Sequence, residues 1–346
     1  MDDAQTEARV RAVAARTTGT DWSGAPVRRL AGHASMRSYW RVGNPGASLV
    51  VMVLPPNGRP EEVTKGAAPA VNPFVDVQRY LRELGVRVPA IHSFYEEEGL
   101  LVLEDLGDEM LETRLLAGDA PEPLYRTAVD QLARLRASAE RRPTGCVAYG
   151  RSFEYDLYRW ELMHFVEWGL EAQRGTRLSP AEREVIERHF DRIARALEAE
   201  PLGFTHRDYQ SRNLMVLPSG EQAVIDFQDA LLGPRQYDLV ALLRDSYVEL
   251  PAPLVDAMIR RYLEQLAAEG GPHLEVGPFR ETFDLVTVQR KLKDAGRFVF
   301  IDRVKKNPDF LRSIPASLRY VREAFDRRPD LSELREVLSG HVPELG

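Results

Sequence analysis

The spacing of apolar residues divides the chain into a strand-rich first part and a mostly helical second part. In the first part, apolar residues alternate or form short runs, as in β-strands. Strands are predicted at 27–30, 38–42, 47–54, 86–95 and 99–104, with helices at 7–16 and 72–84. Beyond residue 105 the apolar period becomes helical, which predicts helices at 124–140, 153–173, 180–200, 238–250, 254–268, 278–299 and 314–327. The pattern predicts an α+β fold of two lobes.

A single β-hairpin is predicted within the helical part. Two short apolar runs, 214–217 and 223–227, flank a Pro-Ser-Gly-Glu turn. If the hairpin is symmetric about its central Ser-Gly pair, Asn213 faces Asp226, and Asp208 lies on the loop just before. An amide oxygen beside a carboxylate suits Mg²⁺, a hard cation that takes few protein ligands and leaves room for phosphates.

The loop from His206 to Asn213 reads H-R-D-Y-Q-S-R-N, which has the spacing of an H-R-D-x-x-x-x-N phosphoryl-transfer loop. Asp-Phe-Gln at 226–228 stands where such enzymes carry D-F-G. The pattern assigns Asp208 as the base that accepts the proton of the acceptor hydroxyl, and Asn213 and Asp226 as Mg²⁺ ligands. We expect His206 to brace the loop. Arg207 is either a ligand contact or an ion-pair partner.

Asp238 follows Asp226 by only twelve residues. That interval is too short for a segment that binds a peptide substrate, so we expect a small acceptor molecule held by the helices. Asp238 itself is expected to open a helix and to brace the catalytic loop by accepting backbone hydrogen bonds.

Several residues of the first part are candidates for nucleotide binding. The turn from Gly32 to Ser35 would lie over the phosphates and offer backbone N–H groups. The third strand lacks the lysine that pairs with the α- and β-phosphates in kinases. Either Arg37 or Arg41, or backbone donors, must then hold the phosphates.

The boundary between the two lobes is predicted near residue 105, where the last strand of the first part ends. A linker at this place offers backbone N–H and C=O groups to an adenine. Glu104 and Leu106 are the candidates for that contact.

Composition narrows the classes of function. The net charge of −7 argues against general nucleic-acid binding. Cys146 is the only cysteine, which excludes an internal disulfide and favours a reducing compartment. No apolar run approaches the roughly 20 residues of a membrane span, and the acidic N-terminus is unlike a signal peptide. We therefore expect a cytoplasmic protein without a membrane or nucleic-acid partner.

The catalytic runs, His206–Asn213 and Ile225–Ala230, resemble the aminoglycoside phosphotransferase family. More closely, the chain resembles the anomeric N-acetylmuramate/N-acetylglucosamine kinases of bacterial peptidoglycan recycling. This likeness rests on 34–41, 51–56, 103–108, 233–245 and 289–293, including a Met-x-x-Pro-Pro strand without lysine. Lys291, the run 294–298 and His33 depart from the pattern and leave the preferred sugar open.

The resemblance implies a protein-kinase-like fold, with a nucleotide-binding lobe at 1–104 and a catalytic, sugar-binding lobe at 105–346. It also implies an ATP- and Mg²⁺-dependent kinase that phosphorylates the anomeric hydroxyl of N-acetylmuramate, N-acetylglucosamine or both. It says nothing of the oligomeric state.

Charged residues on the later helices are candidates for the acceptor pocket, although each is equally compatible with an ion pair. They are Glu161, Arg244, Asp245, Arg290 and Lys293. A mixed set suits a polar sugar better than a polycationic aminoglycoside, and the carboxylate of N-acetylmuramate requires a cation.

Two alternatives stay open. One is a kinase of an aminoglycoside, an amino alcohol or another sugar. The other is a nucleotide-binding pseudokinase, suggested by the absent lysine and by Gln228. The intact set of Asp208, Asn213 and Asp226 argues against the pseudokinase.

Overall fold

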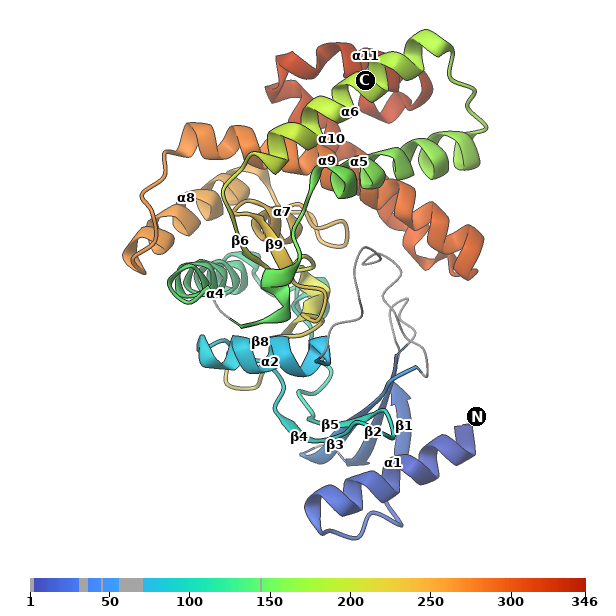
Figure 1. Ribbon diagram of the computed structural model, residues 1–346, viewed down its shortest axis with the longest axis vertical. Helices are drawn as coiled ribbons and strands as arrows, with labels where there is room; N and C mark the ends of the chain where they lie inside the picture. Colours follow the sequence, from blue (N-terminus) through green and yellow to red (C-terminus); the bar gives the residue numbers. More distant parts are fainter. Residues whose placement is uncertain (1–2, 31–36, 45, 56–70, 144) are drawn as a thin grey trace.

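The computed structural model describes residues 3–30, 37–44, 46–55, 71–143 and 145–346. A small lobe built on one β-sheet lies at one end of the molecule, and a larger, mostly helical lobe forms the rest (Figure 1). The predicted α+β class and the two-lobed arrangement are confirmed.

The small lobe is an antiparallel sheet in the order β1-β2-β3-β5-β4. Its strands are β1 (Val27–Leu30), β2 (Ser38–Asn44), β3 (Ala47–Val53), β4 (Ile91–Tyr95) and β5 (Leu100–Glu104). Helix α1 (Asp3–Thr18) covers the outer face of this sheet, where Val10 and Val13 pack against Trp40 and Val51 (Figure 1). This face has an apolar core of its own.

The strand predicted at 86–95 begins only at Ile91. Pro89 has no N–H to donate to a sheet ladder. The carbonyl of Arg87 is directed instead at the helical lobe, where it accepts the N–H of Val224 at 2.8 Å. The residues before β4 therefore connect the two lobes.

Helix α2 (Pro73–Glu83) precedes β4 and β5 in the chain but packs on the helical lobe. Phe74 lies against Phe227, with ring centroids 4.8 Å apart. The carboxylate of Asp76 accepts the N–H of Val147 at 2.7 Å. The core of the helical lobe thus reaches through α2 to the inner face of the sheet.

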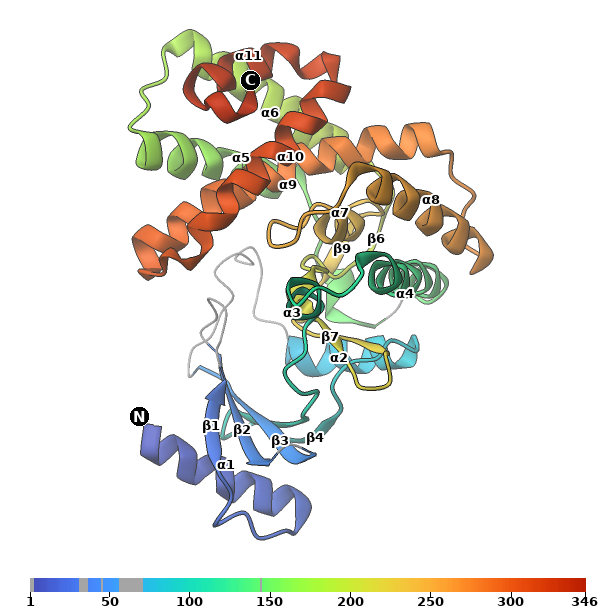
Figure 2. The same cartoon turned by 180° about the vertical axis from the view of Figure 1, so that it is seen from behind.

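The helical lobe is arranged around the long helix α9 (Val276–Lys305), which runs through its centre (Figure 1). The other helices are α3 (Leu111–Leu116), α4 (Pro121–Arg141), α5 (Tyr155–His164), α6 (Pro180–Glu198), α7 (Tyr237–Leu243), α8 (Ala252–Ala268), α10 (Ile314–Arg327) and α11 (Ser332–His341). Seen from behind, α4 and α8 lie together on one flank (Figure 2). Helix α6 starts at a capping box, which the Ser-x-x-Glu sequence at 179–182 encodes: Ser179 and Glu182 bond each other's backbone N–H.

The predicted hairpin is not the only strand pair of the helical lobe. Strands β6 (Leu202–Thr205) and β9 (Leu231–Pro234) form a second antiparallel pair. The sequence Leu-Leu-Gly-Pro of β9 resembles a turn, which is why the pattern missed it. The helix predicted at 238–250 ends at Leu243, so α7 is much shorter than expected.

The hairpin itself, β7 (Leu214–Val216) with β8 (Gln222–Val224), differs from the prediction by one residue in register. Its loop has three residues, not two: Leu217 N–H bonds the carbonyl of Glu221, and Gly220 takes the left-handed conformation with φ of 84°. Asn213 consequently lies opposite Ile225, whose N–H bonds the Asn213 carbonyl at 3.0 Å. The predicted pairing of Asn213 with Asp226 is wrong in register, although both residues reach the same site.

The helix predicted at 153–173 divides into α5 and a π-helix, η2 (Phe165–Ala172). At this junction α9 passes very close, because a Cβ on Gly296 would lie 2.7 Å from the carbonyl oxygen of His164. Only a glycine permits that approach. The π-helix begins directly after this contact, at Phe165.

Candidate active site

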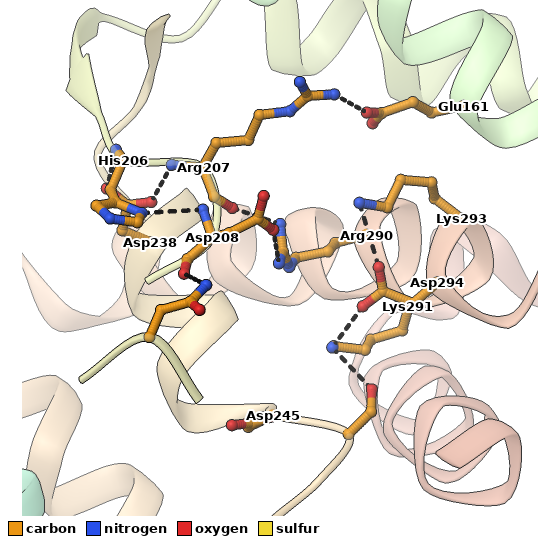
Figure 3. Close-up of polar contacts among 12 residues, drawn as sticks. Glu161, His206, Arg207, Asp208, Asp238, Asp245, Arg290, Lys291, Lys293 and Asp294 are labelled. Atoms are coloured by element: carbon orange, nitrogen blue, oxygen red, sulfur yellow. Dashed lines mark hydrogen bonds and ion pairs between the residues drawn. The ribbon is translucent and has the colours of Figure 1, made fainter. Parts of the chain in front are cut away.

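Asp208 lies on the loop that follows β6, and a buried carboxylate fixes this loop (Figure 3). Both oxygens of Asp238, near the start of α7, accept backbone N–H groups, from His206 at 2.7 Å and from Arg207 at 2.9 Å. Arg207 adopts φ of 80°, an uncommon conformation for a side-chain-bearing residue. The predicted bracing role of Asp238 is therefore visible in these contacts.

Asp238→Ala should destabilise the protein by about 2–4 kcal/mol, because it leaves two buried N–H groups without an acceptor. Urea denaturation followed by circular dichroism measures the change. Asp21→Ala is a matched control: Asp21 also accepts a backbone N–H, from Ser23, but in an exposed turn where water replaces it. Equal changes in the two variants would contradict the bracing role.

His206 connects the catalytic loop to the hairpin. Its Nε2 donates to the carbonyl of Ile225 at 3.0 Å, and its Nδ1 accepts the N–H of Asp208 at 3.2 Å. Burial lowers the pKa of His206, which keeps the ring neutral and suits one donor and one acceptor nitrogen. The imidazole thus sets the position of Asp208 relative to Asp226, which follows Ile225.

The two predicted metal ligands, Asn213 and Asp226, lie close to the hydrogen bonds of His206, one at the end of the catalytic loop and the other after the hairpin. Asn213 donates from Nδ2 to the carbonyl of Asp208 at 2.8 Å, which leaves its Oδ1 for a ligand. Asp226 has φ of 63°, so the chain turns out of the hairpin at this residue. Burial away from water raises the pKa of Asp226, and the nearby carboxylates of Asp208 and Asp229 raise it further.

This donor set fits a magnesium ion that also binds nucleotide phosphates. Carboxylates crowded together favour a cation between them. Oxygen atoms of Gln228 and Asp229, both next to Asp226, are buried without a hydrogen-bond partner. Within the described ranges no three Asp, Glu, His or Cys side chains form a metal site by themselves. Mg²⁺ commonly takes only one or two protein ligands beside the phosphates, as Asn213 and Asp226 would provide.

Cations from two elements determine the charge state of Asp208. Arg290 on α9 donates from Nη2 to Asp208 Oδ1 at 3.0 Å and from Nη1 to the Arg207 carbonyl at 2.7 Å (Figure 3). Loss of water would raise the pKa of Asp208, but the charges of Arg290, Lys293 and Arg207 outweigh it and hold the pKa at about 2. Asp208 is ionised at neutral pH, and its side chain remains 37% exposed.

Glu161, a predicted substrate residue, lies near these cations, but other side chains of the protein already donate hydrogen bonds to its carboxylate. It is 1% exposed, accepts from Arg207 at 3.3 Å and from Gln289 at 2.6 Å. Arg207 is therefore an ion-pair partner of Glu161, one of its two predicted roles. A pair this buried orients the loop above Asp208.

Asp245 lies beneath the catalytic loop. Its carboxylate accepts the N–H of Ser211 at 2.9 Å and the N–H of Tyr247 at 3.0 Å, and it is 1% exposed. Arg244 is also buried and pairs with Glu323 on α10 at 2.8 Å. These contacts are internal to the helical lobe.

The predicted nucleotide residues lie in different surroundings. Ser35 and the Gly32 turn are outside the described residues. Arg37 contacts Tyr39, and its charge opposes the rise in the pKa of Asp226. Glu104 is the last residue of β5. Its carboxylate pairs with Arg87, and the backbone N–H of Glu104 donates to the carbonyl of Ala90.

Arg41, the alternative to Arg37, has another partner. Its guanidinium bonds Asp108 at 2.7 Å, Asp105 at 2.8 Å and the Gly107 carbonyl at 3.0 Å. It therefore fastens β2 to the linker after β5, which contains the half-buried Leu106. Of the two arginines considered for the phosphates, Arg37 is the one near the predicted metal site.

Two residues that hold the site in place were missed from the sequence. Arg151 donates to the carbonyl of Ala230 at 2.7 Å and to that of Gln228, which fixes the segment after Asp226. Gln289 holds Glu161. Arg151 lies in a loop with no recognisable motif. Gln289 belongs to the run 289–293 that carries the family resemblance, but it has no charge that would mark it as a partner of Glu161.

Known proteins that are similar to this chain identify its family. A model of the phosphotransferase enzyme family matches residues 26–273. The chain belongs to this family. The matched span contains both metal-ligand candidates and Asp208, whereas the whole of α9 lies beyond it.

Three relatives of this protein carry the name N-acetylmuramate/N-acetylglucosamine kinase. The kinase of Pseudomonas aeruginosa is 36% identical, over 88% of this chain and 86% of its own. That of Pseudomonas putida is 33% identical, over 88% and 85%. That of Neisseria meningitidis is 32% identical, over 89% and 88%.

Solved structures agree in fold. Choline kinase LicA from Streptococcus pneumoniae has a TM-score of 0.61 at 14% identity, with 92% of this chain and 99% of that one covered. The ADP-bound aminoglycoside phosphotransferase APH(2'')-Ib has a TM-score of 0.57 at 13% identity, with the same coverages. These likenesses confirm the kinase-like fold. Within the described part of the chain, no helix combines the length and apolar character needed to span a bilayer.

Proposed function

We propose that this phosphotransferase transfers phosphate from ATP to the anomeric hydroxyl of N-acetylmuramate, N-acetylglucosamine or both. The observation that carries the proposal is the position of Asp208. It is an ionised, partly exposed carboxylate between two metal-ligand candidates and the cations of α9. Relatives that share about a third of the sequence over most of both chains carry the corresponding name. Such a kinase would serve the reuse of cell-wall amino sugars in the cytoplasm, where ATP is present.

The chemistry of Asp208 suits this acceptor. Phosphoryl transfer depends mainly on positioning and charge neutralisation, so a modest base is enough to take the hydroxyl proton. An anomeric hydroxyl is more acidic than an ordinary alcohol, and a carboxylate with a pKa of about 2 is a weak base. Arg290 keeps Asp208 ionised and oriented. Asn213 and Asp226 would hold Mg²⁺, which supplies positive charge at the phosphates when bound.

Arg37→Ala should raise the KM for ATP about tenfold or more, because a charge-assisted contact to a phosphate contributes about 1.5–3 kcal/mol. Arg37 is the arginine close to Asp226, and it stands in for the lysine that β3 lacks. Steady-state kinetics at saturating sugar measure the effect, with Arg37→Lys retaining most of the affinity.

Arg29→Ala serves as the control for that experiment, since Arg29 is an exposed arginine of β1. An unchanged KM for ATP in Arg37→Ala would mean that backbone donors hold the phosphates.

Kinases of cationic acceptors are the alternative, and the charges around Asp208 oppose them. Arg207, Arg290 and Lys293 all lie close enough to lower its pKa. An aminoglycoside or a choline would bring further positive charge to this place. A neutral or acidic sugar fits better.

A coupled ADP-release assay over N-acetylmuramate, N-acetylglucosamine, glucose, choline and kanamycin tests the proposal. We expect turnover with one or both N-acetylated sugars and at least tenfold lower kcat/KM for the others. Preferred turnover of choline or kanamycin would overturn the proposed acceptor class.

A further inference from the structure

The two sugars named for the relatives differ in one charged group. N-acetylmuramate is N-acetylglucosamine with a lactyl ether on the third ring carbon, and this ether ends in a carboxylate. A site that recognises the difference needs a cation within reach of the reacting sugar. This step rests on the proposed function, since it takes the amino sugar as the acceptor.

Two of the cations beside Asp208 are already occupied. Arg207 is 4% exposed and pairs with Glu161. Arg290 is 1% exposed and binds both Asp208 and the Arg207 carbonyl. Their bonds hold the catalytic loop together, and neither guanidinium is open to a sugar substituent.

A third cation, Lys291, is directed into the protein. It donates to Ser246 at 3.1 Å and to Asp294 at 2.7 Å (Figure 3). Burial lowers the pKa of this lysine. Its side chain is only 2% exposed, so it too is out of reach.

Lys293 differs from these three residues. Its side chain is 15% exposed, and its ammonium points toward the space beside Asp208 (Figure 3). Its ion-pair partner is Asp294, 3.2 Å from Nζ, whose other oxygen is bound by Lys291. One carboxylate is thus shared between two ammonium groups. An ammonium has three donors, so Lys293 retains the capacity to bind a further anion.

The position of Lys293 matches the dimensions of a sugar. It follows Arg290 by three residues on α9, which is about 4.5 Å along the helix axis. Its charge still acts on Asp208. A ring held with its first carbon at Asp208 would bring the lactyl ether of its third carbon within reach of Lys293.

We propose that Lys293 binds the lactyl carboxylate of N-acetylmuramate and so sets the preference of this kinase for the acidic over the neutral sugar. Glu161 does not compete for this lysine, because Arg207 and Gln289 hold its oxygens. Asp294 keeps the ammonium charged and in place.

The test is the ratio of kcat/KM for N-acetylmuramate to kcat/KM for N-acetylglucosamine. Lys293→Met should lower this ratio about 10- to 100-fold, because the variant loses a charge-assisted hydrogen bond to the acidic sugar alone. Lys293→Arg keeps the charge and should keep most of the ratio. The methyl ester of N-acetylmuramate gives the reciprocal check: the native enzyme should discriminate against the ester, and Lys293→Met should not.

Arg303→Met is the matched control, because Arg303 is an exposed cation on the same helix. It should leave the ratio unchanged. Equal losses with both sugars in Lys293→Met would overturn the assignment of Lys293 while leaving the proposed function intact. A native enzyme that phosphorylates neither sugar would overturn the proposed function itself.

Discussion

Asp208→Asn lowers kcat by about 10²- to 10⁴-fold, the usual contribution of a positioned general base, and leaves the protein folded. Asparagine keeps the shape of the side chain but cannot accept the proton. Arg290 loses its carboxylate partner but retains the carbonyl of Arg207. Steady-state kinetics measure the loss, and thermal unfolding checks that the fold is intact.

Asp326→Asn is the control, since it makes the same chemical change at an exposed ion pair with Arg335. It should retain full activity. If Asp208→Asn kept more than a tenth of the native kcat, another group would have to accept the proton.

Asp226→Ala weakens Mg²⁺-dependent nucleotide binding by about 100-fold or more, because loss of a metal ligand exceeds the 10- to 100-fold effect of an outer-shell change. The site would retain Asn213 alone. Isothermal titration with a non-hydrolysable ATP analogue, with and without Mg²⁺, separates the binding that depends on the metal from the binding that does not. Binding without Mg²⁺ should change little.

If Asp226→Ala binds the nucleotide with the same Mg²⁺ dependence as the native protein, the metal lies elsewhere. Asp229→Asn then becomes the next variant, since one oxygen of Asp229 is buried without a partner beside Asp226.

Local sequence signals predicted the parts of the fold that local physics determines. The period of apolar residues located most helices, and the Ser179–Glu182 capping box marked the start of α6. The spacing of the 206–213 motif placed Asp208 and Asn213 on one loop. Asp238 was recognised as a brace because a carboxylate at a helix N-terminus attracts backbone N–H groups.

The sequence did not predict the register of the hairpin or the ion pairs between residues far apart in the chain. The register of the hairpin depended on a local choice that the Pro-Ser-Gly-Glu sequence leaves open, a loop of two or of three residues, and Gly220 in the left-handed conformation belongs to the longer loop. Arg41 pairs with Asp105 and Asp108, more than sixty residues away in the chain. The sequence therefore left Arg37 and Arg41 equal, and the ion pairs separate them.

The charged residues of the late helices show the same limit. The sequence made Arg290 and Lys293 candidates for the acceptor pocket without indicating their partners. Packing assigns Arg290 to the catalytic loop, because it is buried against Asp208, and leaves Lys293 partly exposed. Burial, which the sequence does not record, makes that distinction.

The central claim is that Asp208 activates an anomeric hydroxyl. The most direct test is to incubate the protein with Mg²⁺, ATP and either N-acetylglucosamine or its methyl glycoside, in which the anomeric oxygen is blocked, and to locate the phosphate by phosphorus NMR. We predict a sugar 1-phosphate from the free sugar, with phosphorus coupled to the anomeric proton, and no product from the glycoside. Phosphorylation of the glycoside, or a phosphate on any other oxygen of the free sugar, would contradict this account.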